Sequence, residues 1–154
     1  MKKRLLLATT CLALAFAPIG RAEDAKPKPA AGEEKHTELS EKMEKLNGAY
    51  RRLKRQIADP AKNESSLALI ATIKTQTEAS LAYKPEFTAE QPAADQAKFV
   101  ERYQAEMKKM IELVGKLETS VKAGKNDEAV KTIAELDAQQ KSSHKEFRKP
   151  KPKA

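Results

Sequence analysis

The sequence predicts an all-α protein whose fold class is an antiparallel up-down-up-down four-helix bundle. The first observation is composition: the 154 residues include no Trp and only five Gly, and the good helix formers Ala, Glu, Lys, Leu and Gln are abundant. The second is that apolar residues recur at gaps of three or four in four separate stretches, which is typical of amphipathic helices. The third is that the connections between these stretches are mostly short, as in bundles of antiparallel neighbours.

The N-terminus has the pattern of a secretory signal peptide, residues 1–22. Basic residues at positions 2–4 precede a largely apolar run over 5–19, and small residues lead up to a cleavage point after Ala22. This run of 15 residues is shorter than the roughly 20 that a membrane-spanning helix needs, so we expect a periplasmic chain without a stable membrane anchor. Cys11 lies inside the removed segment and leaves the mature chain with no disulfide and no thiolate.

The mature chain of 132 residues has the size of one domain. Residues 23–36 combine Pro, Gly and charge and predict a flexible leader, and the Lys-Pro repeats of 149–154 predict a flexible basic tail. The helical domain is expected over 37–148. Four basic residues leave with the signal peptide, so the net charge falls from +8 to +4. This mild excess, without clustered arginines interleaved with aromatics, argues against a nucleic-acid partner.

The first helix is expected to start at Thr37, whose hydroxyl can cap it, with Ser40 as a second choice, and to stop at Pro60. Charged residues occupy its outer face. Its apolar stripe comprises Leu39, Met43, Leu46, Tyr50, Leu53 and Ile57.

The second helix has a weaker stripe, opened by Asn63 or Ser65 and closed before Pro85. The two prolines of 83–92 break the helical periodicity, so this segment is expected to be the long connection of the bundle. The stripe itself comprises Leu67, Ile70, Ile73, Thr77 and Leu81.

The third helix has the strongest stripe and is expected to end at Gly124 in the left-handed conformation. Asn126 or Asp127 can then cap the fourth helix. The third stripe comprises Phe99, Tyr103, Met107, Met110, Val114, Leu117 and Val121. The fourth comprises Ala129, Ile133, Leu136, Gln140, His144 and Phe147.

Met43 and His144 fall at nearly the same height of this bundle. Its first and last helices are antiparallel neighbours, so the start of one lies beside the end of the other. Met43 lies about 9 Å beyond Thr37, and His144 lies about 6 Å before Arg148. Both residues are on the core-facing stripes. A thioether and an imidazole facing each other can fill both axial positions of a haem iron, which supports single-electron transfer.

Simpler interpretations of these residues remain open at this point. A methionine on an apolar stripe is most often a core filler, and Met107 and Met110 fit that description. A histidine near a helix C-terminus more often complements the helix dipole than binds a metal. His36, at the edge of the leader, is expected to be solvated. Spacing alone therefore does not decide in favour of haem.

Both ends of the helical region resemble the soluble cytochrome b562 family. Its first helix is similar to residues 37–53, TELSEKMEKLNGAYRRL, and its fourth is similar to residues 123–148, AGKNDEAVKTIAELDAQQKSSHKEFR. The resemblance extends over nearly all of 37–148 and is poor from about 58 to 95. It implies one non-covalent b-type haem with Met43 and His144 as axial ligands.

The resemblance also implies further haem-binding residues. Arg148 matches a terminal arginine that can pair with a haem propionate. Tyr103 and Met107 fall where the family places bulky haem-packing residues, with methionine replacing an aromatic at the second position. Leu46 of the first segment belongs to the same implied set. Related covalent bundles carry Cys-x-x-Cys-His in the fourth helix, whereas this chain has QKSSH at 140–144, so no thioether link can form.

The implied function is electron transfer by a monomeric periplasmic protein. Its expected partners are periplasmic redox proteins, and its residual positive charge favours acidic ones. An enzyme is not expected, because the chain has no HExxH, no glycine-rich phosphate loop and no catalytic triad pattern. The alternative function is a haem-free periplasmic helical chaperone or stress-response protein, which would not need a Met and a His at matching heights.

Overall fold

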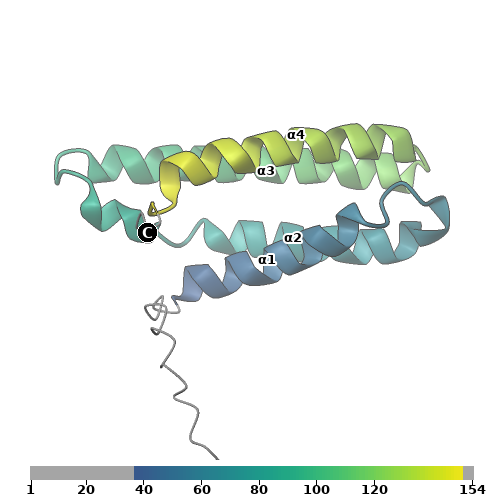
Figure 1. Ribbon diagram of the computed structural model, residues 1–154, viewed down its shortest axis with the longest axis horizontal. Coiled ribbons are helices and arrows are strands. Elements are labelled where there is room, and N and C mark those ends of the chain that lie inside the picture. Colours follow the sequence, from purple (N-terminus) through teal and green to yellow (C-terminus); the bar gives the residue numbers. More distant parts are fainter. Residues whose placement is uncertain (1–36, 151–154) are drawn as a thin grey trace, which may run out of the picture. The chain divides into compact units, whose positions relative to one another are not determined.

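The computed structural model describes residues 37–150 (Figure 1), a range that includes the expected helical domain. The predicted signal peptide, the leader and residues 151–154 of the tail lie outside the described residues. Four α-helices and two short 3-10 helices make up this part of the chain: α1 (Glu38–Lys54), η1 (Pro60–Lys62), α2 (Asn63–Ser80), η2 (Glu86–Glu90), α3 (Gln96–Lys122) and α4 (Asn126–Phe147).

The helices pack in the order of the chain, α1 against α2, α2 against α3 and α3 against α4. In Figure 1, α1 lies with α2 and α4 lies with α3. No strand occurs between residues 37 and 150. The predicted all-α up-and-down four-helix bundle is confirmed. Within the same residues, α1 and α4 are not among the helix pairs whose backbones pack closely, and this difference shapes the site described below.

The start of α1 follows from local chemistry. Thr37 Oγ1 accepts a hydrogen bond from Ser40 N at 3.2 Å, and Ser40 Oγ accepts one from Thr37 N at 2.9 Å, so the two predicted cap residues form a capping box. The helix ends at Lys54, before the predicted stop at Pro60. The chain instead turns after Lys54, and Ile57 still reaches the core with 3% of its surface exposed.

The connection from α3 to α4 turns at Gly124, which has a φ of 70° and confirms the predicted left-handed residue. The predicted cap on α4 is wrong: Lys125 occupies the cap position without a side-chain bond, and Asn126 already belongs to the helix. The Asn126 amide is buried and donates to the carbonyl oxygen of Ile57 at 2.7 Å and to Asn63 Oδ1 at 2.8 Å. These bonds tie the start of α4 to the connection between α1 and α2.

The apolar side chains form two clusters. The main core joins all four helices through thirteen buried residues, including Leu46, Leu53, Ile70 and Leu117. The second, which we call the end cluster, consists of the buried residues Phe99, Tyr103, Met107 and Phe147. It lies where α3 begins and α4 ends, so the bundle has an aromatic end and an end closed by the asparagines.

Candidate functional site

One contact sets how α1 and α4 lie against each other. The hydroxyl of Tyr50, a residue that is 4% exposed, lies 2.9 Å from Asp137 Oδ1 and 3.1 Å from the carbonyl oxygen of Ile133, and it donates to these acceptors. Lys54 Nζ pairs with Asp137 Oδ2 at 2.5 Å. Burial, together with the bond to Asp137, raises the pKa of Tyr50 well above its usual range, so the hydroxyl remains a donor.

This contact places the two candidate ligands at one height. Met43 lies seven residues before Tyr50, and His144 lies seven residues after Asp137. Seven residues are two helical turns, which advance about 10.5 Å and return to nearly the same face of the helix. Because α1 and α4 run in opposite directions, both steps lead toward the same end of the bundle. The register therefore supports the predicted match in height, on the same seam between α1 and α4.

The surroundings of Met43 agree with this placement. Its side chain is partly buried and packs against both the main core and the end cluster. The end cluster includes Phe147, three residues beyond His144 on α4. Met43 of α1 and Phe147 in the last turn of α4 therefore both pack in the end cluster or against it.

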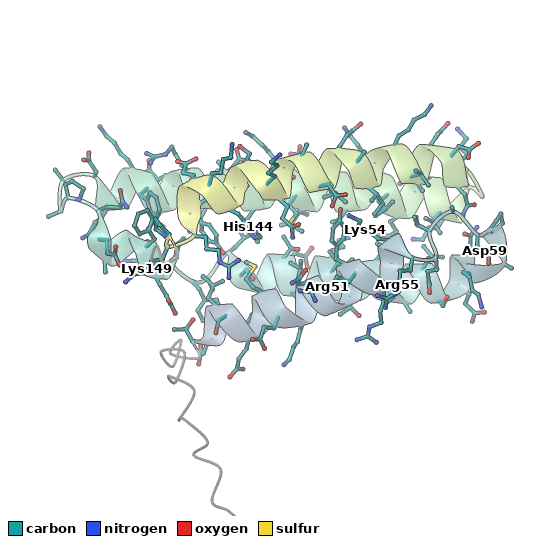
Figure 2. All side chains as sticks on the ribbon, viewed as in Figure 1. Arg51, Lys54, Arg55, Asp59, His144 and Lys149 are labelled. Carbon is teal, nitrogen blue, oxygen red and sulfur yellow. The ribbon has the colours of Figure 1, made fainter. Side chains whose placement is uncertain are left out.

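His144 is exposed, although its periodicity places it on the core-facing stripe. Figure 2 shows it between the ribbons of α4 and α1. The expectation of a core position fails because these two backbones do not pack closely, so no neighbouring helix covers the ring. Partial shielding from water and the charge of Arg148 both lower the pKa of His144 below its ordinary value. The imidazole is therefore neutral at neutral pH, with a nitrogen lone pair available to a metal.

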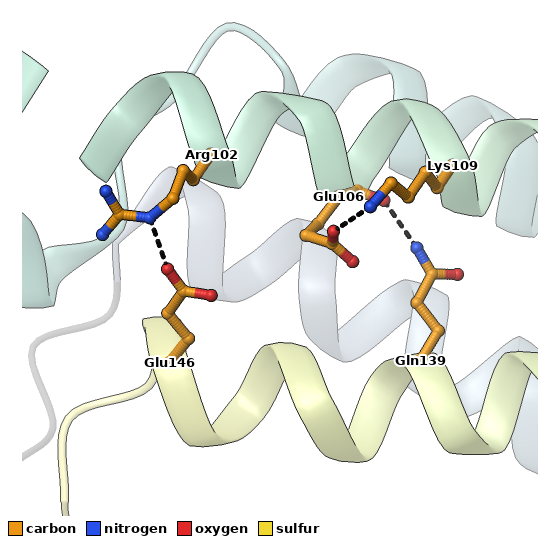
Figure 3. A network of polar contacts seen from close by, with 5 residues as sticks. All are labelled: Arg102, Glu106, Lys109, Gln139 and Glu146. Atoms are coloured by element: carbon orange, nitrogen blue, oxygen red, sulfur yellow. Dashed lines mark hydrogen bonds and ion pairs between the residues drawn. The ribbon is translucent and has the colours of Figure 1, made fainter. Parts of the chain in front are cut away.

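Polar contacts with α3 fix this part of α4 (Figure 3). Arg102 Nε pairs with Glu146 Oε1 at 2.6 Å, and Gln139 Nε2 donates to the carbonyl oxygen of Glu106 at 2.7 Å. The ring of Phe147 packs edge-on against Phe99, with centroids 5.2 Å apart. The last turns of α4 are thus held to α3, while the His144 side chain remains exposed.

A shallow surface hollow lies beside His144. It is lined by His144, Lys145, Arg148, Lys149 and Pro150. Lys149 Nζ forms an ion pair with Glu90 Oε1 at 2.5 Å, which joins the segment that follows α4 to η2. The exposed Arg148, the residue expected to pair with a propionate, is brought to the same hollow as the candidate histidine.

The other predicted site residues lie in the two clusters. Leu46 is 3% exposed in the main core, one turn from Met43. Tyr103 and Met107 belong to the end cluster, against which Met43 packs. The Tyr103 hydroxyl donates to the carbonyl oxygen of Ser80 at 3.3 Å, and burial raises its pKa to about 12.

Sequence reasoning missed the contact that sets the register. Tyr50 was assigned only to an apolar stripe, and Asp137 was not singled out. The spacing was a usable signal, since the two residues lie at equal and opposite distances from Met43 and His144. A tyrosine hydroxyl on a buried stripe also needs a hydrogen-bond partner.

The donor set fits a haem iron with two axial ligands. The site offers a partly buried thioether on α1 and a neutral imidazole on α4, with aromatic side chains beside the thioether that can cover a porphyrin and a cation beside the imidazole that can meet its carboxylates. The chain has no match among curated proteins. The model of the cytochrome b562 family matches residues 38–148, which include all four α-helices. By this match the chain belongs to the cytochrome b562 family.

Proposed function

We propose that this protein is a periplasmic electron carrier that holds one non-covalent b-type haem between Met43 and His144. Membership of the family implies a haem-binding electron carrier with a b-type haem, and proteins of this family are not enzymes. The observation that supports the ligand pair is the register between α1 and α4, set by the 2.9 Å contact of Tyr50 with Asp137.

The two ligands have different tasks. When bound, a haem supplies an iron that gains and loses one electron. His144 offers a neutral imidazole at neutral pH, because shielding and Arg148 disfavour its protonated form. Met43 offers a soft thioether, which raises the reduction potential relative to a second imidazole. A haem held by both side chains would have no ligand position left for oxygen, so it would support outer-sphere electron transfer.

Other residues hold and shield the cofactor. The end cluster excludes water from one side of the site, and Met107 supplies a flexible side chain where the family has an aromatic. Arg148 is the cation for a propionate. Because residues 140–143 contain no cysteine, affinity depends on the ligands and on burial alone.

The periplasmic location rests on the signal-peptide pattern of residues 1–22. None of the helices described over 37–150 has the length and apolarity of a membrane span. Expression of the full chain in a bacterium should give a periplasmic product whose mass lacks residues 1–22. A full-length cytoplasmic product would contradict this location.

Absorption spectra with and without dithionite test the ligand pair. The purified protein should be red and low-spin, and acid-acetone should extract its pigment. His144→Ala should lose most haem affinity, whereas Met43→Ala should keep haem with a partly high-spin spectrum and a lower potential. Met110→Ala is the matched control, since Met110 is also partly buried but packs against the main core from α3, and its spectrum should not change.

Two outcomes would contradict the proposal. Unchanged spectra in both Met43→Ala and His144→Ala would refute the ligand pair. A colourless protein that takes up no added haemin would refute haem binding and would favour the haem-free chaperone instead.

A further inference from the structure

Four exposed cations lie on α1 and α4, the two helices that carry the candidate ligands. Arg51 and Arg55 come from the end of α1, and Lys141 and Lys145 come from the second half of α4. Figure 2 shows Arg51 and Arg55 along α1, on the view that also shows His144. Over residues 37–150, none of the four forms an ion pair with a carboxylate. We call these four residues the basic face.

The spacing of these cations opposes helix stability. Arg51 and Arg55 are four residues apart, as are Lys141 and Lys145, and like charges at this spacing repel. Three lysines of the described helices instead pair with a glutamate at helical spacing: Lys109 with Glu106, Lys122 with Glu118 and Lys125 with Glu128. The two cation pairs of the basic face lack such ion pairs.

Helix dipoles account for only part of the basic face. A cation at the C-terminal end of a helix is favourable, and this applies to Arg51 and the C-cap residue Arg55 of α1 and to Lys145 of α4. The effect falls off within the last turn. Lys141 lies six residues before the end of α4 at Phe147, so it gains little from the dipole. Helix stability therefore accounts for three of the four cations and leaves Lys141 without this explanation.

The register places the basic face beside the candidate ligands. Since Tyr50 lies opposite Asp137, Lys141 is level with Leu46, three residues or about 4.5 Å from the height of Met43. Arg51 lies on α1, eight residues or about 12 Å along the helix axis from Met43. A negatively charged surface that meets both pairs of cations would cover the seam where His144 is exposed.

We propose that the basic face is the docking surface for an acidic electron-transfer protein. This inference rests on the proposed function, because docking there matters only if the seam holds the redox centre. Two cations about 6 Å apart on each helix suit paired carboxylates on a protein surface. An anionic membrane is the less fitting partner, since a helix that lies on a membrane also presents an apolar face, and Val130 is the only large apolar residue exposed over 37–150.

The first test needs no haem. A fluorescein-labelled peptide of about 20 glutamates is titrated into the full chain at about 10 mM salt, where screening is weak. Arg51→Glu/Arg55→Glu should weaken binding at least about tenfold, and the milder Arg51→Gln/Arg55→Gln about threefold. Lys108→Glu/Lys116→Glu changes the net charge equally on α3, where both lysines are exposed, and should weaken binding less than about twofold. Equal loss of peptide affinity in the α1 variant and the α3 control would overturn the proposal.

The second test uses the haem-loaded chain and a reduced acidic [2Fe–2S] ferredoxin. The rate at which the ferredoxin reduces the haem-loaded chain should be about tenfold lower in Arg51→Glu/Arg55→Glu than in the parent protein, and it should be unchanged in the α3 control. In the parent protein the rate should fall as salt rises. Equal rates in all three proteins would overturn docking. The last arm measures binding to vesicles with 30% phosphatidylserine. If vesicle binding depends on the basic face and peptide binding does not, the basic face is a lipid-binding surface and the proposal is wrong. If no haem is taken up, the proposed function fails, and the peptide titration still decides the surface.

Discussion

Removing one oxygen atom tests the contact that holds α1 and α4 in register. Tyr50→Phe keeps the buried ring and deletes the hydroxyl that lies 2.9 Å from Asp137 Oδ1 and 3.1 Å from the carbonyl oxygen of Ile133. Lys54 and water can still satisfy the Asp137 carboxylate. The substitution therefore loosens the link between the two helices while leaving the main core filled.

The magnitude follows from the kind of bond that is lost. A hydrogen bond to a charged group contributes about 1.5–3 kcal/mol. The Asp137 side chain is 41% exposed, so we take the lower end of this range, about 1.5 kcal/mol. For a domain of about 110 residues this lowers Tm by roughly 6 °C. If the contact organises the seam before haem binds, the same free energy weakens haem affinity by about tenfold.

Haemin titration and thermal melting of Tyr50→Phe distinguish a loss of the α1–α4 register from a general loss of stability. The matched control is Ile70→Val, which removes one methyl group from a fully buried residue of α2, costs about 0.5–1.5 kcal/mol and leaves the Tyr50–Asp137 contact in place. We expect both variants to melt earlier and only Tyr50→Phe to bind haem more weakly. Equal haem affinity in the two variants would refute the role of Tyr50 in register.

Three further predictions concern pH and the backbone. Because the pKa of His144 is below its ordinary value of about 6.5 and only the neutral ring binds iron, haem affinity should be full above that value and fall as pH drops through the lowered pKa. If haem affinity did not change between pH 7 and pH 4, this prediction would be wrong. The buried Tyr103, with a pKa near 12 against 10 when unfolded, should contribute about 2–3 kcal/mol that is present below pH 10 and lost between pH 10 and 12. Urea melts of Tyr103→Phe should show a smaller alkaline loss than the parent protein. Gly124→Ala should cost about 1 kcal/mol through backbone strain, whereas Gly115→Ala, in open space within α3, should stabilise by about 0.5–1 kcal/mol; equal shifts in Tm would argue against strain.

Local chemistry was predictable from the sequence. The hydroxyl of Thr37 can cap only a helix that begins beside it, and a glycine after an apolar stripe marks a left-handed turn, so both Thr37 and Gly124 behave as predicted. The four apolar stripes also fixed the number and order of the helices. These features depend on neighbours within one or two turns of the chain.

Features that depend on distant partners were not predictable. Asn126 looks like a helix cap, yet its amide bonds to Asn63 and Ile57, more than 60 residues away. The exposure of His144 depends on the spacing between α1 and α4, which no periodicity encodes. That spacing reflects the Tyr50 contact, and a tyrosine on an apolar stripe gives no hint of which acceptor its hydroxyl will find.

The asparagine pair makes the two ends of the bundle unequal in their motions. Asn63 and Asn126 exchange hydrogen bonds where α2 and α4 begin, Asn126 also donates to the carbonyl oxygen of Ile57, and Asn63 donates to that of Val121 in α3. The segments at this end therefore cannot separate without breaking polar contacts. At the opposite end, Leu39 and Met43 of α1 pack against the end cluster, to which α4 contributes Phe147. Amide hydrogens should exchange slowest around Ile57 and Asn126 and fastest in the first turns of α1. If exchange follows this order, the end of the bundle that carries the proposed ligands opens more easily than the asparagine end, and haem loading would not require the whole chain to unfold.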